Sequence, residues 1–245
     1  MTRIDGARAV ILLAHGSPDP RHRRGVERLV RRIESMTTAR ASGELVAVAY
    51  LDHHPPRVAD VVATLTDRGV RRATVVPLLV TAGFHSRIDV PNAVAELSEG
   101  APGCDVSLAE PFATSSYFPD AIAELIERAG LPDNESTGVL VLGAGAKDPT
   151  ALASFERAAA VVSDAHSYFT VAGFIDGDPS PKIAESALTE AGCSRPFFAV
   201  TVVVSEGIFF DRMVDSATKS GARQIKGTLV DTDSLAKFAL GVRRT

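Results

Sequence analysis

A run of four apolar residues, 10–13, leads through an alanine into His15 and Gly16. A short apolar run bounded by turn-forming residues is typical of a buried strand in a parallel sheet. Gly16 and Pro18 end this run, and a helical pattern follows from about residue 25. The sequence therefore predicts a strand with His15 at its carboxyl end, which is the edge where open α/β sheets bind ligands.

A second histidine follows another apolar run. Residues 75–80 are apolar, Gly83 ends the run, and His85 lies just beyond it. Because parallel strands end at the same edge of a sheet, the two imidazoles can converge over one cleft. Neutral imidazole is a common ligand of borderline metals and can take up a proton near neutral pH. We therefore expect His15 and His85 to act together. For either histidine alone, a surface or packed loop position is the alternative.

Strands and helices alternate along the first half of the chain. Further apolar runs lie at 45–51 and 106–109, and apolar positions recur at helical spacing within residues 25–35, 58–65, 91–97 and 117–129. Helices between strands predict βαβ units and a parallel sheet. Pro91 is expected at or near the first turn of its helix, where a proline removes no hydrogen bond.

The pattern begins again after a polar linker at residues 131–137. The corresponding positions are Gly16 and Gly145, Pro20 and Pro149, His15 and Ala144, Asp52 and Asp176, and His85 and Phe209. This repeat predicts an α/β protein of two similar Rossmann-like domains, residues 1–131 and 132–245, with a cleft between them. Each domain is expected to hold a mostly parallel four-stranded sheet flanked by helices. Only the first copy carries the histidines, which favours a chemical role over a packing role.

Composition excludes several classes of protein. The chain has 245 residues, of which 45% are hydrophobic and 23% charged, which is ordinary for a soluble globular protein. Its net charge of −4 argues against nucleic acid as a partner. Cys104 and Cys193 lie far apart and offer no zinc or iron–sulfur signature. We see no apolar run of the ~20 residues that a membrane span needs, nor a signal-peptide core. We therefore expect a protein of the reducing cytoplasm without a membrane partner.

Four short motifs occur in order along the first half: His15-Gly16-Ser17, Tyr50-Leu51-Asp52, Pro77-Leu78-Leu79, and Gly83-Phe84-His85 with Asp89-Val90-Pro91. This ordered set resembles the class II tetrapyrrole chelatases, the sirohydrochlorin cobalto- and ferrochelatases of the CbiX and SirB type. The resemblance spans residues 9–130, and beyond residue 138 it rests mainly on the repeat. It implies insertion of Fe²⁺ or Co²⁺ into sirohydrochlorin, toward sirohaem or cobalamin, with the metal as substrate and no tightly bound cofactor.

The resemblance also implies roles for individual residues. The two active-site histidines of the family match His15 and His85, which would bind the metal and relay protons from the ring nitrogens. Asp52 stands where the family usually has the longer glutamate, and it would orient an imidazole or accept a proton. The residues expected to bind the tetrapyrrole are Gly16, Ser17, Arg21, Pro77, Leu78 and Gly83.

Arg21 and Ser17 each have an alternative role. A guanidinium such as that of Arg21 pairs well with the carboxylates that fringe a tetrapyrrole. Ser17 and the backbone at Gly16 can bind a carboxylate at a helix start. The alternatives are a solvated basic helix face for Arg21 and a turn or cap role for Ser17. His53 and His54, beside Asp52, either add metal affinity or are exposed loop residues.

Two other functions compete with the chelatase. A metal or tetrapyrrole carrier without turnover would bind the same molecules, and release of metallated ring by unchanged protein separates the two. An α/β enzyme that binds phosphate at Gly16 and Ser17 is disfavoured, because the opening stretch lacks both the GxGxxG and the P-loop lysine patterns. The sequence also lacks the nucleophile elbow of an esterase.

Overall fold

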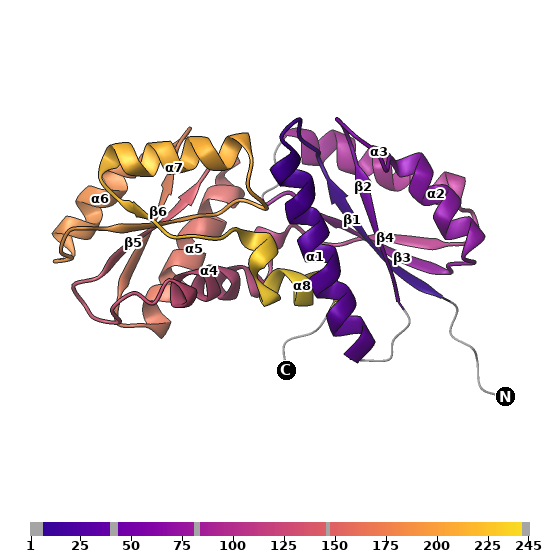
Figure 1. Cartoon of the computed structure of the whole chain (residues 1–245). Coiled ribbons are helices and arrows are strands. Elements are labelled where there is room, and N and C mark those ends of the chain that lie inside the picture. The colour runs from indigo at the N-terminus through magenta and orange to yellow at the C-terminus, as the bar shows by residue number, and fades with distance from the viewer. Residues whose placement is uncertain (1–6, 40–43, 81–83, 146–147, 242–245) are drawn as a thin grey trace. The chain divides into compact units, whose positions relative to one another are not determined.

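The structure is a computed structural model of the whole chain, and it describes residues 7–39, 44–80, 84–145 and 148–241, with residues 37–39 and 84–87 described by backbone alone (Figure 1). The chain divides into two compact units. Unit 1 comprises residues 1–112 and 236–245, and unit 2 comprises residues 113–235. Each unit is described separately below.

Unit 1 is built on a four-stranded parallel sheet in the order β2-β1-β3-β4. Its elements along the chain are β1 (Arg8–Ala14), α1 (Pro20–Ala39), β2 (Leu45–Tyr50), α2 (Val58–Asp67), β3 (Arg72–Pro77), α3 (Phe84–Gly100), β4 (Asp105–Leu108) and the short 3-10 helix η1 (Phe112–Thr114). β1 is central and is buried from its second residue to its last. Apolar residues on one face of the sheet pack against α2 and α3, whose buried side chains include Val61, Leu65 and Leu97.

Unit 2 repeats this plan with a parallel sheet in the order β6-β5-β7-β8. Its elements are α4 (Tyr117–Arg128), β5 (Gly138–Gly143), α5 (Pro149–Ala165), β6 (Phe169–Phe174), α6 (Pro181–Glu190), β7 (Phe198–Thr201), α7 (Ile208–Ser220), β8 (Arg223–Gln224) and the 3-10 helix η2 (Leu229–Asp231). Helices α6 and α7 pack together on one face of the sheet, and α4 and α5 lie together on the other (Figure 1). The last helix, α8 (Asp233–Ala239), begins in unit 2 and ends in unit 1. The predicted fold class, with two four-stranded parallel sheets flanked by helices, is confirmed.

The compact units divide earlier in the chain than the predicted boundary at residues 131 and 132. The reason lies in α4, which follows the first sheet in sequence but packs against α5 of the second. The aromatic ring of Phe118 on α4 meets that of Phe155 on α5, with centroids 5.2 Å apart. Conversely, residues 236–241 belong with unit 1, where the ring centroids of Phe238 and Phe112 are 5.2 Å apart.

Two helices begin earlier than expected. α1 starts at Pro20 rather than near residue 25, because the Asp19 carboxylate accepts the N–H of Arg21 at 2.9 Å and caps the first turn. α3 starts at Phe84, so Pro91 lies inside the helix and not at its first turn. A proline there removes one helical hydrogen bond, and α3 continues through it. The backbone of His85 consequently belongs to the first turn of a helix instead of a loop.

No helix formed by the described residues combines the length and the apolar character needed to cross a membrane.

Candidate active site

The ends of β1 and β2 place His15 beside Asp52. The register pairs Ala14 with Tyr50, the last residues of the two strands. The pairing continues past the strands, because the Leu51 N–H donates to the Ala14 carbonyl at 2.9 Å and the Asp52 N–H donates to the His15 carbonyl at 2.8 Å. The half-buried His15 and the exposed Asp52 therefore share the carboxyl edge of the sheet, as the sequence predicts.

Gly16 allows this close approach. Its φ is +93°, and a Cβ at this position would lie 2.2 Å from the carbonyl oxygen of Asp52. Unit 2 repeats the feature, since Gly145 has a φ of +109° and a Cβ there would lie 2.5 Å from the Asp176 oxygen. Only glycine combines this positive φ with the absence of a Cβ, so Gly16 allows the two strand ends to lie this close together. Any contact it makes with a substrate would come from its backbone.

The Asp52 carboxylate is held from several sides. Its Oδ1 accepts the His53 N–H at 2.7 Å and lies 3.7 Å from Arg57 Nη1, while its Oδ2 lies 4.0 Å from His53 Nε2. The hydrogen bond from the His53 backbone holds the pKa of Asp52 below its usual range. Nearby positive charge from His53, Arg57 and His15 acts in the same direction. Asp52 is therefore an exposed carboxylate beside His15 at neutral pH.

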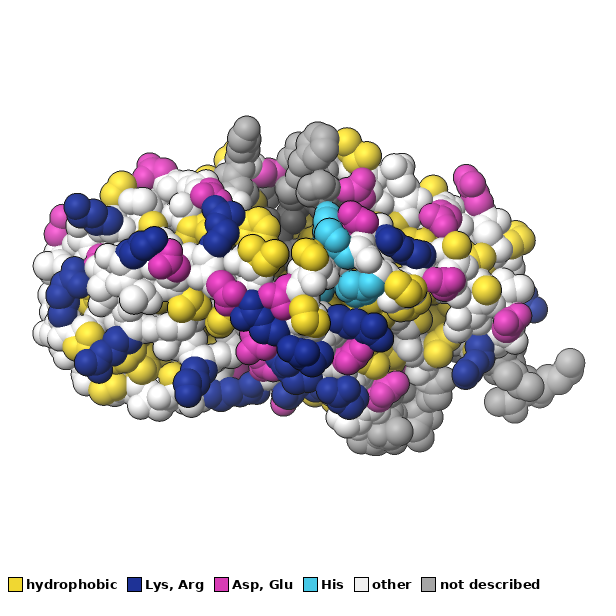
Figure 2. All heavy atoms as spheres, turned by 45° about the horizontal axis from the view of Figure 1, so that its top comes forward, with side chains coloured by type: hydrophobic (Ala, Val, Ile, Leu, Met, Phe, Trp, Pro, Cys, Tyr) yellow, Lys and Arg dark blue, Asp and Glu magenta, His cyan; other side chains and the backbone are white. Residues whose placement is uncertain are grey.

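Further imidazoles surround this edge: His53 and His54, which the sequence places beside Asp52, and His22 on α1. The ring centroids of His15 and His53 are 6.1 Å apart. His54 meets the ring of Tyr50 edge-on at 4.0 Å, and His22 on α1 lies 6.4 Å from the same ring. Figure 2 shows histidine side chains gathered on the surface near a group of Lys and Arg. The register of α1 brings His22 here, and this signal was missed because the helix was expected to begin after it.

Burial shifts the pKa of two side chains in this group, His22 and Tyr50. Burial lowers the pKa of His22, and the neighbouring His54 lowers it further. Burial raises the pKa of Tyr50 to about 12. A neutral imidazole at His22 and a protonated phenol at Tyr50 therefore line the inner side of the group at neutral pH.

Ser17 and Arg21 are engaged in starting α1. The Ser17 hydroxyl accepts the N–H of Asp19 at 3.1 Å. The Arg21 guanidinium donates to both oxygens of Asp19, with its Nη2 2.6 Å from Oδ2. These bonds from Arg21 lower the pKa of Asp19 to about 2. The Ser17 contact is of the turn type given above as its alternative, whereas Arg21 pairs with Asp19 and a carboxylate ligand would share Arg21 with Asp19.

The remaining predicted residues lie at the end of β3 or just beyond it. Pro77 is the last residue of that strand, and the Leu78 N–H donates to the Leu13 carbonyl at 2.8 Å. Both residues are buried, so they shape the strand end by packing. Gly83 lies outside the described residues, as does the side chain of His85. The expected convergence of His15 and His85 therefore stays a prediction.

The described side chains form no preassembled metal cage. Within the described ranges, no group of three or more His, Cys, Asp or Glu residues is arranged to hold a metal ion. Cys104 and Cys193 are both free thiols, and burial raises the pKa of each. The described part of the edge thus offers imidazole and carboxylate ligands, not thiolates.

The equivalent edge of unit 2 has different chemistry. Ala144 stands in the place of His15, and the Asp176 carboxylate receives two hydrogen bonds from Arg212 at 3.0 and 3.2 Å. The Arg212 guanidinium also lies over the ring of Phe209, 5.3 Å from its centroid. A salt bridge and an aromatic ring therefore occupy the positions where unit 1 carries its acid and its second histidine.

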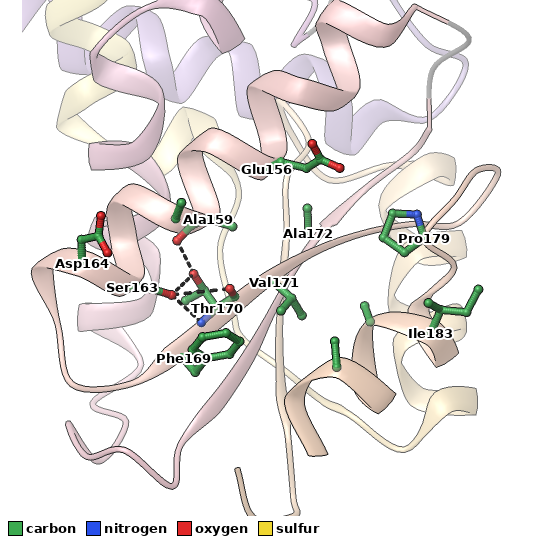
Figure 3. Close-up of a pocket in the computed structure, with 13 residues that line it drawn as sticks. Glu156, Ala159, Ser163, Asp164, Phe169, Thr170, Val171, Ala172, Pro179 and Ile183 are labelled. Atoms are coloured by element: carbon green, nitrogen blue, oxygen red, sulfur yellow. Dashed lines mark hydrogen bonds between the residues drawn. The ribbon is translucent and has the colours of Figure 1, made fainter. Parts of the chain in front are cut away.

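A cavity of about 420 Å³ lies in unit 2, and none of the predicted site residues lines it (Figure 3). It runs along the edge strand β6 between α5 and α6, and its walls include Ala159, Phe169, Val171 and Ile183. The Ser163 hydroxyl bonds with the Thr170 hydroxyl and amide at 2.9 and 2.8 Å, which joins α5 to β6. The largely apolar lining includes the carboxylates of Glu156 and Asp164 but no imidazole or thiol, so this cavity lacks the histidine ligands that are expected at the site of metal insertion.

Comparison with known proteins gives a consistent result. The CbiX family model matches residues 9–129. Sirohydrochlorin ferrochelatase from Priestia megaterium is 23% identical over 211 residues, covering 86% of this chain and 78% of that protein. Sirohydrochlorin cobaltochelatase from Sulfolobus acidocaldarius is 32% identical over 85 residues, covering 35% of this chain and 67% of that protein. The structure of SirB from Bacillus subtilis with Fe³⁺ has a TM-score of 0.77 at 15% identity, covering 96% of this chain and 93% of that one.

Proposed function

The chain belongs to the CbiX family of sirohydrochlorin chelatases, and we propose that His15, Asp52 and His85 carry out its metal insertion at the carboxyl edge of unit 1. The observation that supports this assignment is the hydrogen bond from the Asp52 N–H to the His15 carbonyl, which fixes an imidazole and a carboxylate side by side. The equivalent edge of unit 2 carries Ala144 in place of that imidazole. The metal ion is a substrate of this reaction.

The reaction exchanges a metal ion for two protons. A divalent ion loses water, enters the macrocycle and displaces the hydrogens of two ring nitrogens, so that two protons leave. We assign His15 a bond to the ion, because imidazole binds Fe²⁺ and Co²⁺ without the tight hold of four thiolates. His85 supplies the second imidazole. The two histidines then accept the protons that the ring releases.

Asp52 provides negative charge for the incoming cation. Its lowered pKa keeps it ionised at neutral pH, and its exposed position lets a hydrated ion approach. The shorter side chain is held in place by the His53 N–H, 2.7 Å from Oδ1. We propose that Asp52 attracts the ion and orients an imidazole, and that it fulfils the role of the longer glutamate through this fixed position.

Turnover separates this function from a carrier. Purified protein at low concentration is mixed anaerobically with excess sirohydrochlorin and Fe²⁺, Co²⁺ or Ni²⁺ in turn, and the ring absorption is followed. A chelatase metallates many equivalents of ring per protein above the rate without protein. A single equivalent that stays bound would establish the carrier instead. The same series identifies the preferred metal, and with it sirohaem or cobalamin synthesis as the pathway.

Two features support a location in the cytoplasm: the free cysteine thiols and the use of Fe²⁺ as a substrate. Cys104 and Cys193 are free, which supports a reducing environment such as the cytoplasm. Fe²⁺ as a substrate requires the same conditions. We therefore place the protein in the cytoplasm, with sirohydrochlorin and a divalent metal ion as its ligands and without nucleic acid as a partner.

A further inference from the structure

We propose that His53 is a further metal-handling residue, and that with His15 and Asp52 it forms the landing point for the incoming ion. This inference rests on the proposed function. It adds His53, for which the sequence allows either a role in metal affinity or a position in an exposed loop.

The spacing of the two rings fits a shared ion. The centroids of His15 and His53 are 6.1 Å apart, with the rings inclined at 45°. An ion about 2.1 Å from one nitrogen of each ring holds the two ring centres roughly 5–6 Å apart. The separation of the two rings is therefore close to the one that a shared ion requires. Asp52 Oδ2, 4.0 Å from His53 Nε2, places a carboxylate next to the same point.

The backbone at His53 is unusual for this type of residue. Its φ is +69°, and it is the only non-glycine residue among those described with a positive φ. This conformation costs a side-chain-bearing residue about 1–2 kcal/mol. The loop maintains it through two hydrogen bonds to Asp52, from the His53 N–H to Oδ1 at 2.7 Å and from the His54 N–H to the carbonyl oxygen at 2.9 Å. Local strain of this kind is concentrated at functional sites.

The internal repeat shows that the fold does not need a histidine here. The position that matches His53 in unit 2 is Gly177, one residue after Asp176, and it lacks the positive φ. Unit 1 therefore carries an imidazole, in a costly conformation, where its repeat carries a glycine. Two other matching positions differ in the same way, with His15 in unit 1 against Ala144 in unit 2 and His85 against Phe209. All three histidines therefore occur in the same unit.

The exposure of the side chains indicates the order in which an incoming ion meets them. The side chains of His53 and Asp52 are 36% and 62% exposed, whereas His15 is half-buried at the strand end. A hydrated ion therefore meets His53 and Asp52 first and passes inward to His15. Two imidazoles leave most coordination positions to water, which the ring nitrogens can then replace. The landing point is thus a labile pair of imidazole ligands, and Asp52 contributes charge and no bond, because the described residues contain no group of three or more His, Cys, Asp or Glu that could hold a metal ion.

Co²⁺ alone, without tetrapyrrole, is the probe for this inference. Calorimetry and visible absorption measure its binding to the wild type, His53→Gly, His15→Ala and His166→Ala. His53→Gly removes the imidazole while relieving the backbone strain, so the fold is not expected to lose stability. We expect its Kd for Co²⁺ to rise about tenfold or more. The same variant should raise the KM for the metal more than it lowers kcat. His166→Ala in unit 2 should bind as the wild type does.

The two variants separate the role of His53 from the proposed function. If His53→Gly binds Co²⁺ within twofold of the wild type while His15→Ala loses binding and insertion, the role of His53 is wrong and the proposed function stands. If, instead, His15→Ala inserts metal at the wild-type rate, the proposed site itself is wrong. Should His53→Gly fail to fold, His53→Asn replaces it, because asparagine tolerates a positive φ and lacks an imidazole.

Discussion

Gly16 is the residue on which the geometry of His15 and Asp52 depends most directly. Its positive φ turns the chain away from β1, and its missing side chain lets the Asp52 carbonyl approach. The two requirements can be separated, because Gly69 also has a positive φ, +60°, but has no atom within 4 Å of its Cβ position. A comparison of these two glycines isolates the close approach.

Gly16→Ala should destabilise unit 1 more than Gly69→Ala. At Gly69 an alanine meets only the cost of the left-handed backbone, about 1–2 kcal/mol. At Gly16 the strand ends must also separate, which we expect to add at least about 1 kcal/mol and to slow metal insertion. Urea unfolding measures the first effect and a sirohydrochlorin assay the second. Equal destabilisation by the two alanines would show that the contact with Asp52 is unimportant.

The sequence predicted most elements well and missed the first residues of two helices. Helices and strands with clear apolar periodicity, such as the region around Val10 and the helix before Gly130, lie where expected. The start of α1 was missed because its first turn, from Pro20 to Arg24, is polar and depends on the Asp19 cap. The start of α3 was missed because Pro91 is usually a first-turn residue, although the helix continues through it.

The Asp19 cap gives α1 a dependence on pH. The pKa of Asp19 is lowered to about 2, so the cap contributes stability above the unfolded value near 4 and loses it as the pH falls toward 2. Asp19→Ala should therefore be less stable than the wild type at pH 7, with a gap that narrows between pH 4 and 2. Thermal unfolding across this range measures the gap.

Asp148 is a control from the repeat, because it precedes Pro149 and caps α5 in the same way, accepting the Thr150 N–H at 2.9 Å. Asp148→Ala should also reduce stability at pH 7. Metal insertion should respond to Asp19→Ala alone, since that change releases Arg21, which is expected to bind the tetrapyrrole. A gap for Asp19→Ala that stays constant from pH 7 to 2 would contradict the role of its charge.

At the scale of the whole molecule, the fold is repeated, and we propose that only the first copy carries the chemistry. The strand order, the glycine after the first strand and the acid after the second recur in both units. The repeat and the position of His15 could be predicted from sequence, because short apolar runs and their end residues are local signals. His53 could be placed beside Asp52 from the sequence, but the approach of its ring to that of His15 could not, because it depends on a positive φ. The approach of His22 to Tyr50 could not be predicted either, because it depends on the register of α1.

Matched substitutions at the two repeated acids test this asymmetry. Asp52→Asn keeps an acceptor for the His53 N–H but removes the charge beside His15, so we expect metal insertion to fall about tenfold or more. Asp176→Asn only weakens a half-exposed pair with Arg212, and insertion should stay within about twofold. The assay is the initial rate with Co²⁺ and sirohydrochlorin. A larger loss from Asp176→Asn would assign the chemistry to unit 2.

The most direct measurement is the steady-state rate of sirohydrochlorin metallation by His15→Ala, compared with the wild type and with His166→Ala at equal folded protein. If the imidazole at the end of β1 binds the metal and accepts a ring proton, the rate with His15→Ala falls about a hundredfold and the rate with His166→Ala does not change. Metallation by His15→Ala at the wild-type rate would contradict the account.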